Sequence, residues 1–289
     1  MDLEEFAAAV GADDPVTIAG AGTRGGAVPG VRQVSAPRDI AWLRAEEMTV
    51  CVGAGTPVAE LDEALMEVGQ CVAITSTGTV GGALAVGRSG LRRLGYGPVR
   101  DTLLQARYVS AAGDVVQAGG PTVKNVSGFD LCRLLVGSHG TLGFLGEVIL
   151  RTRPRARFEQ WYATTADPHD MLNRLYRPTS LLWDGATTWA LLEGNAVDVE
   201  AAARRHGLDA VSGPPELPTG GRWSIAPSEV GSLAGRFVAE VGVGVVHHVD
   251  AAPPRPVGDG VRQLHRRLKA NFDPTGRLNP GVDVLALPR

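Results

Sequence analysis

The residues best suited to contact a ligand in this sequence are closely spaced glycines between positions 122 and 154. The segment reads TVKNVSGFDLCRLLVGSHGTLGFLGEVILRTRP, and Gly137, Gly140 and Gly143 lie three residues apart. Each glycine costs about 1 kcal/mol in a helix relative to alanine, so this spacing disfavours a stable helix. Glycine also lets the backbone pack close against another group. We therefore predict a loop that touches a ligand.

A second glycine-rich loop, GAGTRGG at residues 20–26, follows the short apolar run of residues 16–19. Read literally it contains GxGxxG, the dinucleotide fingerprint, which requires a helix to begin in the loop. Pro29 and Gly30 follow too soon for that helix and no helical period appears, so we do not expect a Rossmann fold. Small residues in a tight turn can still point several backbone N–H groups at a phosphate. An ordinary glycine-rich turn is the alternative.

Residues 75–101 form a third such segment, with seven glycines and little regular period. A loop of this length inside a compact domain is usually functional. Before it, Thr56 is predicted to cap a helix that begins at Pro57 and stops at Gly69. Further expected elements are strands at 16–19, 49–52, 72–74 and 147–152, a hairpin of 103–109 and 114–117, and helices at 198–206 and 261–272.

Composition places the chain among ordinary globular proteins. Its 289 residues suffice for two modest domains, and its net charge of −3 gives no indication of a nucleic-acid partner. Cys51, Cys71 and Cys132 lack CxxC spacing, which argues against an iron–sulfur or zinc site held by this chain. The acidic start is unlike a signal peptide and no apolar run is long enough to span a bilayer. We expect a cytoplasmic protein with no transmembrane segment.

Two motifs resemble one group of flavoproteins. Residues 122–154 resemble the KN-(S/T)-G-(Y/F)-D-L … G-S-x-G-T-L-G … E signature of the vanillyl-alcohol oxidase / p-cresol methylhydroxylase (PCMH) type, most of all the FAD-binding subunits of glycolate oxidases. Residues 269–281 resemble the K-x-x-F-D-P-x-G-x-x-N-P-G motif of the same proteins. The resemblance implies an α+β fold: a two-lobed PCMH-type FAD-binding domain at 1–155, a small α+β cap domain at 156–260, and a C-terminal helix and loop at 261–289 that return to the flavin.

The resemblance also implies non-covalent FAD and its contacts. Covalent attachment through His or Cys is not expected, because neither residues 20–26 nor residues 75–82 contain either. A pyrophosphate loop is implied at Gly20, Gly22, Thr23 and Arg24, a second wall at Thr75, Gly78, Thr79, Gly81 and Gly82, and further contacts at Asp101, Ser127, Gly140, Gly143 and Val148. Asn279 is implied to lie near the isoalloxazine ring, with a turn asparagine that fixes its own backbone as the alternative.

A catalytic residue is not identifiable from the sequence. Flavin oxidation of a 2-hydroxy acid needs a base for the hydroxyl proton and a cation for the carboxylate. Relatives often carry a His-x-His metal motif, but His247 and His248 are adjacent and would face opposite sides of a strand. We therefore expect no metal site. His139 replaces a glutamate common in the GSxGTLG turn, and the candidate cations are Arg88, Arg92, Arg93 and Arg100.

The functional hypothesis is the FAD-binding subunit of a glycolate oxidase-like complex, which oxidises a 2-hydroxy acid and passes electrons to a partner. Its partners would be a second flavin subunit and an iron–sulfur subunit, through which the chain could lie at the membrane periphery. One alternative is a self-sufficient FAD-dependent dehydrogenase or oxidase acting on a hydroxy acid or alcohol. Another is a non-catalytic scaffold subunit that binds no flavin.

Overall fold

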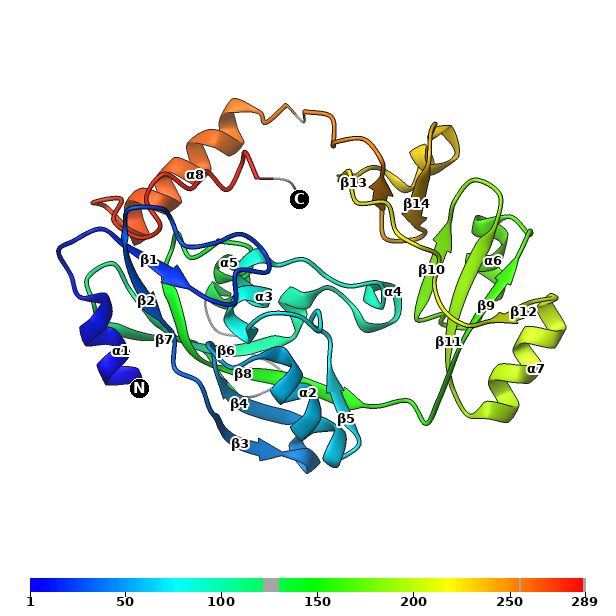
Figure 1. Ribbon diagram of the computed structural model, residues 1–289, viewed down its shortest axis with the longest axis horizontal. Coiled ribbons are helices and arrows are strands. Elements are labelled where there is room, and N and C mark those ends of the chain that lie inside the picture. Colours follow the sequence, from blue (N-terminus) through cyan, green and yellow to red (C-terminus); the bar gives the residue numbers. More distant parts are fainter. Residues whose placement is uncertain (122–129, 255, 288–289) are drawn as a thin grey trace. The chain divides into compact units, whose positions relative to one another are not determined.

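The computed structural model describes residues 1–121, 130–254 and 256–287. The chain forms two compact units, shown together in Figure 1. The first comprises Met1–Ser89, Pro98–Arg155 and Val257–Ala286, and the second mainly Gly90–Gly97 and Ala156–Pro256. The first unit gathers the N-terminal segments and the C-terminal helix and loop, and the short segment at 90–97 belongs to the second.

The larger lobe of the first unit is built on one antiparallel sheet in the order β3-β4-β8-β6-β7, with β5 paired to the far end of β8. Its strands are β3 (Ile40–Arg44), β4 (Thr49–Gly53), β5 (Gln70–Val72), β6 (Leu103–Val109), β7 (Val115–Gly119) and β8 (Phe144–Pro154). Strand β8 is central because its apolar residues, such as Val148 and Leu150, are buried and pack into the lobe's core. The hairpin expected from the sequence is β6 paired with β7.

Helix α2 (Val58–Glu67) covers this core with Val58, Leu61 and Leu65, all fully buried. The N-cap assignment from the sequence was wrong, because Pro57 occupies the cap position. The hydroxyl of Thr56 instead accepts from Asp39 N at 3.0 Å and lies 3.2 Å from Asp39 O, so Thr56 ties the helix start to the segment before β3.

The smaller lobe holds α1 (Leu3–Val10) and the parallel pair β1 (Val16–Ala19) and β2 (Arg32–Ser35). In the described chain the next element after β1 is β2 and not a helix, which agrees with the expectation against a Rossmann fold. The C-terminal residues 277–279 run beside β1: Val16 N donates to Arg277 O and Asn279 N donates to Val16 O, both at 2.9 Å. The two ends of the chain therefore meet in one lobe.

The glycine-rich segment at 75–101 is more regular than its sequence indicates. It contains α3 (Val80–Val86), α4 (Arg93–Tyr96) and the short 3₁₀ turn η2 (Val99–Asp101), and α5 (Leu131–Leu135) follows further along the chain. The first turn of α3 tolerates Gly81 because the helix lies against Ala54, whose Cβ would be 2.8 Å from a Cβ at position 81. Close packing, not the helical period, places this helix.

The second unit is a seven-stranded antiparallel sheet in the order β12-β9-β11-β10-β14-β15-β13. Its elements are β9 (Phe158–Thr164), α6 (Pro168–Arg174), β10 (Ser180–Trp183), β11 (Thr188–Gly194), α7 (Ala196–His206), β12 (Asp209–Val211), β13 (Gly221–Ser224), η3 (Pro227–Ser232), β14 (Phe237–Glu240) and β15 (Val245–His248). The expected helix at 198–206 is α7, which begins two residues earlier because Asn195 caps it.

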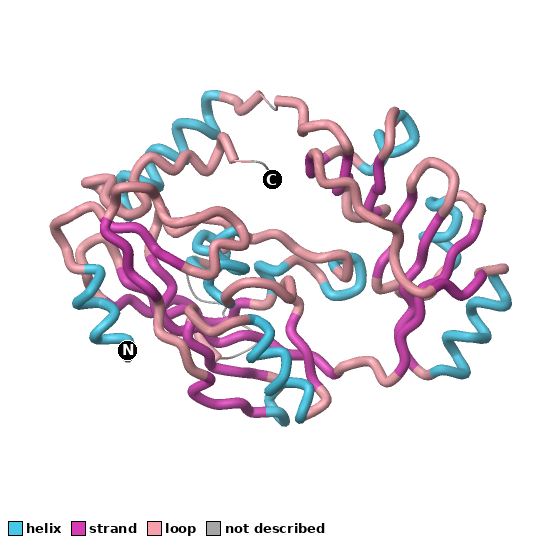
Figure 2. The backbone as a smooth tube through the Cα atoms, viewed as in Figure 1, coloured by secondary structure: helices cyan, strands magenta, loops and turns pink. Residues whose placement is uncertain are grey.

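Helix α8 (Asp259–Phe272) belongs to the first unit and is followed by a tight turn. The carboxylate of Asp273 accepts from Lys269 Nζ at 2.6 Å, Arg277 N at 3.0 Å and Leu278 N at 2.8 Å. These bonds direct the chain back toward β1. Figure 2 shows the loops that join the helices and strands of the first unit. Among the described helices, not one has the length and apolarity needed to cross a bilayer.

Candidate functional site

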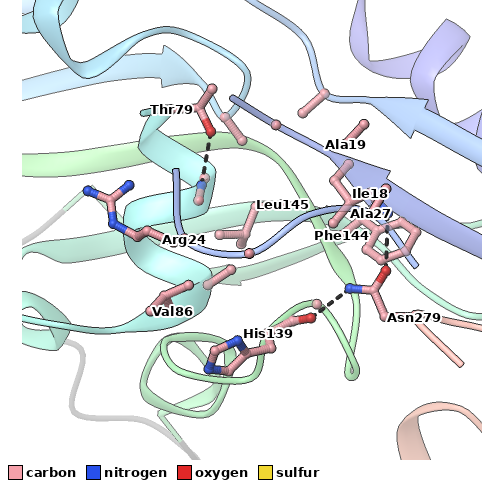
Figure 3. Close-up of a pocket in the computed structure, with 18 of the residues that line it drawn as sticks. Ile18, Ala19, Arg24, Ala27, Thr79, Val86, His139, Phe144, Leu145 and Asn279 are labelled. Atoms are coloured by element: carbon pink, nitrogen blue, oxygen red, sulfur yellow. Dashed lines mark hydrogen bonds between the residues drawn. The ribbon is translucent and has the colours of Figure 1, made fainter. Parts of the chain in front are cut away.

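A cavity of about 340 Å³ lies in the first unit where segments distant in sequence meet, and we call it the glycine-lined cavity. Its walls are the loop after β1, the start of α3, the turn before β8 and Asn279 (Figure 3). Its volume falls in the range of about 300–1,000 Å³ that is usual for cofactor and small-molecule sites.

The loop after β1 presents backbone to this cavity. Gly22 and Gly25 have φ values of +69° and +99°, which side-chain-bearing residues rarely adopt. A Cβ added at Gly22, Gly25 or Gly26 would meet nothing within 4 Å, so open space lies beside the loop. This loop can therefore bring backbone N–H groups close to an anionic group such as a phosphate.

Arg24 ties this loop to the next glycine-rich segment. Its guanidinium donates to the hydroxyl of Thr75 and, at 3.2 Å, to Thr77 Oγ1. Gly78, at φ +76°, leaves the space that Thr23 and Arg24 occupy, because a Cβ there would collide with both side chains. Burial and the neighbouring Arg88 both lower the pKa of Arg24. Because the ordinary pKa of an arginine is about 12.5, Arg24 stays protonated at neutral pH despite this shift, and a positive charge stands at one edge of the cavity.

The start of α3 is fixed by hydrogen bonds that also form the cavity wall. Thr79 caps the helix by accepting from Gly82 N at 3.1 Å. Gly81 N donates to Ala54 O at 2.7 Å, and Val80 N donates to Thr56 O at 2.9 Å. The wall is therefore locked to the end of β4.

The turn before β8 packs on the other end of α3. His139 N donates to Ala85 O at 2.9 Å, and His139 adopts φ +51°. Gly140, at φ +71°, makes room for Asn279, whose Nδ2 would be 2.7 Å from an added Cβ. A glycine is needed at position 143 for a different reason, because a Cβ added there would collide with the ring of Tyr108 in the core. Gly140 and Gly143 thus serve packing as well as the cavity.

Asn279 joins three segments at the cavity. Its Oδ1 accepts from Thr17 Oγ1 at 2.8 Å and Ile18 N at 3.1 Å, and its Nδ2 donates to His139 O at 2.6 Å (Figure 3). The residue is 7% exposed and adopts φ +45°. These side-chain bonds reach remote residues, which differs from a turn asparagine that fixes its own backbone.

His139 and the arginines set the charge of the cavity. Burial, together with the positive charge of Arg88, lowers the pKa of His139. Its imidazole is therefore neutral at pH 7. Of the other candidate cations, Arg92 lies in the second unit and pairs with Glu159 at 2.9 Å and with Glu193, and Arg100 is exposed near Asp101.

The structure brings most of the sequence-predicted contacts to this one cavity. Ten line it: Gly20, Gly22, Thr23, Arg24, Thr79, Gly81, Gly82, Gly140, Gly143 and Asn279. Thr75 binds Arg24, and Gly78 packs beside it. Asp101 pairs with Arg133 at 3.3 Å, and Val148 is buried in the core, so neither lines the cavity. Ser127 lies outside the described residues. FAD contacts at these positions remain predictions.

Sequence reasoning missed the apolar part of the cavity. Leu135, Phe144 and Leu145 line it together with Ala85 and Val86 of α3. Their signal was weak, because the residues are ordinary core types and α3 itself was not recognised. The backbone carbonyl of His139 was also missed, because only the folded chain places it against Asn279.

The two adjacent histidines have separate partners. His247 Nε2 lies 2.9 Å from Glu240 Oε1, and His248 Nε2 lies 2.8 Å from Ala234 O. Across the residues described, there is no group of three or more His, Cys, Asp or Glu arranged to hold a metal ion.

Comparisons with known proteins agree with this geometry. Residues 4–119 match the FAD binding domain family. The chain is 28% identical to glycolate oxidase subunit GlcE of Escherichia coli, over 96% of this chain and 95% of that protein. It is 36% identical to a D-lactate dehydrogenase of Archaeoglobus fulgidus over 50% of this chain, but spans only 34% of that enzyme. Among solved structures, alkyldihydroxyacetonephosphate synthase has a TM-score of 0.70 at 15% identity, covering 96% of this chain and 74% of that one.

Proposed function

We propose that this chain, an FAD-dependent oxidoreductase whose residues 4–119 match the FAD binding domain family, is the FAD-binding subunit of a glycolate oxidase-like complex. The observation that carries the proposal is the similarity to GlcE, which extends over nearly the whole length of both chains. A match of that extent favours the same subunit role over a shared domain alone.

The residues of the glycine-lined cavity fit FAD. The open backbone of Gly22, Gly25 and Gly26 suits the pyrophosphate, and Arg24 adds a positive charge at the same loop. Phe144 and Leu145 offer an apolar surface for the flat ring. When bound, FAD supplies an acceptor for a hydride equivalent and a donor of electrons.

The chain's own residues hold and shield this group. Asn279 fixes β1 and the turn before β8 relative to each other, so the two sides of the cavity keep their spacing. His139, neutral at pH 7, adds no second charge beside Arg24. The apolar side chains exclude water, which strengthens electrostatic interactions inside the cavity.

The partners in this proposal are a second flavin subunit and an iron–sulfur subunit, in the cytoplasm or at the membrane periphery. A related second subunit is consistent with the 44% identity, over 27% of this chain, to glycolate oxidase subunit GlcD of Bacillus subtilis. A 2-hydroxy acid is the proposed substrate of the complex, and electrons would leave through the iron–sulfur subunit.

The test is co-expression of this chain with the two partner subunits of the same organism. We expect one particle that contains all three chains and more than one flavin, and glycolate-dependent dye reduction that disappears when this chain is omitted. A chain that stays monomeric beside its partners, with full activity in their absence, would contradict the proposal.

The competing function is a self-sufficient D-lactate dehydrogenase-like enzyme. The observation in its favour is the 36% identity to the Archaeoglobus fulgidus enzyme over half of this chain. It is the weaker candidate, because about two thirds of that enzyme has no counterpart here. Rapid reduction of the lone chain's FAD by D-lactate would favour it.

A further inference from the structure

A second cavity of the first unit, about 860 Å³ in volume, lies beside α8, and we call it the α8 groove. One side is α8, with Arg262, Arg266 and Leu268. The other sides are α5 with the turn that follows it, at Leu134 and Leu142, and the C-terminal loop, which includes the carboxylates of Asp273 and Asp283. The groove adjoins the glycine-lined cavity at Ser138, which lines both, and nothing in the proposed flavin chemistry uses it.

The apolar stripe of α8 is covered at one end and open at the other. Phe272 packs against the core and Leu268 lines the groove, but Leu264 is 54% exposed and Val261 is 47% exposed. All four residues fall on one helical face, at spacings of three, four and four. A helix usually buries such a stripe, so the open half indicates a surface that something covers.

Helix α8 is anchored at its C-terminal end, so its first half can stay exposed to solvent. Lys269 Nζ donates to Thr141 O at 2.8 Å and Leu278 O at 3.1 Å, and it pairs with Asp273 at 2.6 Å. These bonds hold the C-terminal turn of the helix. The preceding turns are thus presented on a fixed base, as a rigid docking element requires.

The surface of α8 is basic, whereas the chain as a whole is acidic. Helix α8 carries four basic residues against a single acidic one, Asp259, although the chain as a whole has a net charge of −3. The basic residues are Arg262, Arg266, Arg267 and Lys269. Arg262 and Arg266 border the groove, together with His265. An apolar floor between arginines fits an acidic segment with one apolar face.

The shape favours a protein segment over a lipid surface. A bilayer is flat at this scale and cannot reach the floor formed by Leu134, Leu142 and Leu268, whereas side chains of a helix can. Interfacial helices also present aromatic residues to the membrane, but the aromatic residue of α8, Phe272, packs against the core.

We propose that the α8 groove and the exposed stripe of α8 dock an acidic amphipathic helix of a partner subunit. The inference rests on the proposed function, because it assigns the surface through which this chain would join the complex. Apolar side chains of the partner contact Leu264, Leu268 and the groove floor, and its carboxylates pair with Arg262 and Arg266.

The test uses the full chain co-expressed with both partner subunits. The variants are Leu264→Glu and the double change Arg262→Glu/Arg266→Glu, and the matched control is Arg204→Glu/Arg205→Glu at the exposed end of α7. Like charges brought together at an interface are unfavourable, so we expect the α8 variants to weaken assembly at least ~10-fold. The control and the FAD content of each variant should match the wild type.

Hydrogen exchange gives a second measurement that needs no variant. Amides of residues 259–272 should exchange more slowly in the wild-type complex than in the lone chain. Unchanged exchange there, or wild-type assembly by the α8 variants, would overturn the inference while leaving the proposed function intact. A wild-type chain that forms no complex would overturn both.

Two other occupants are distinguishable. If the α8 variants abolish binding of the lone chain to phosphatidylglycerol vesicles and leave the complex unaffected, the surface is lipid-directed and the inference is wrong. If they abolish concentration-dependent self-association instead, as measured by light scattering, the occupant is a second copy of this chain and the inference is likewise wrong.

Discussion

At the scale of single residues, the candidate site depends on backbone conformations that few side chains permit. Gly22, Gly140, His139 and Asn279 all have positive φ, and all border the same cavity. Glycine adopts such conformations freely, whereas at non-glycine residues such as His139 they persist only where the surrounding structure holds them, and they gather at ligand sites. Substitutions at these positions should therefore alter the cavity directly.

Gly22→Val should abolish FAD binding with little loss of fold. Valine is β-branched and disfavours φ +69°, so the loop must change its path. Acid-released FAD and the visible spectrum report binding, and circular dichroism reports the fold. The control is Gly213→Val, because Gly213 also has open space around it but lies in the second unit and has no positive φ. Full flavin content in Gly22→Val would refute the loop assignment.

Asn279→Asp should destabilise the protein and weaken FAD binding. Aspartate can replace Oδ1 but not the Nδ2 donor, so a carboxylate oxygen would face His139 O. Leaving buried acceptors unpaired costs about 1–3 kcal/mol. Denaturant unfolding and flavin titration measure the two effects. The control Asn195→Asp keeps an acceptor at the N-cap of α7 and should be near neutral.

His139 should make stability fall as the pH drops below about 6.5. The pKa of His139 is lowered in the folded state, so the unfolded chain binds this proton more readily. The contribution of His139 to the free energy of unfolding is therefore fully present above its unfolded pKa and is lost as the pH falls. Asparagine tolerates φ +51°, so the variant His139→Asn removes the titrating group without changing the backbone conformation. Unfolding free energies between pH 7.5 and 5.5 should fall less in the variant. Equal slopes would contradict this role.

At the scale of elements, the sequence predicted those with a clear period and missed those placed by tertiary contacts. The β6–β7 hairpin and α8 follow their alternating and helical patterns. Helix α3 was missed because Gly81 and Gly82 weaken its pattern, while its position depends on Thr79 and on contact with Ala54. The cap of α2 was misassigned because Thr56 bonds to Asp39 instead.

The turn after α8 should depend on Asp273. Burial raises the pKa of Asp273, but hydrogen bonds from Lys269, Leu278 and Arg277 outweigh this effect and hold that pKa below its usual value. Asp273→Asn removes the charge and should lower the free energy of unfolding by about 1.5–3 kcal/mol. The control is Asp170→Asn, which breaks an exposed pair with Arg174 and should cost about 0.5 kcal/mol or less. Similar losses in both variants would refute the anchoring role.

At the scale of the whole molecule, the motifs at residues 122–154 and 269–281 allowed the fold to be predicted, because their described residues belong to one unit. The assignment of residues 90–97 to the second unit was not predictable. It depends on Arg92 meeting Glu159 and Glu193 and on Tyr96 OH donating to Glu193 at 2.8 Å, pairs about 65 to 100 residues apart. Long-range pairs of this kind leave no local pattern.

The division of labour within the proposed complex leads to the last prediction: the isolated chain should bind FAD but oxidise 2-hydroxy acids poorly. The described residues around the glycine-lined cavity are the proposed flavin contacts, and the ionisable side chains among them are Arg24 and a neutral His139. Loss of a general base alone typically costs ~10²–10⁴-fold in rate.

Anaerobic stopped-flow measures reduction of the flavin by glycolate and D-lactate, with the lone chain and with co-expressed partners. We expect slow reduction alone and fast reduction in the complex. Fast reduction of the lone chain would place substrate oxidation in this protein and favour the self-sufficient enzyme.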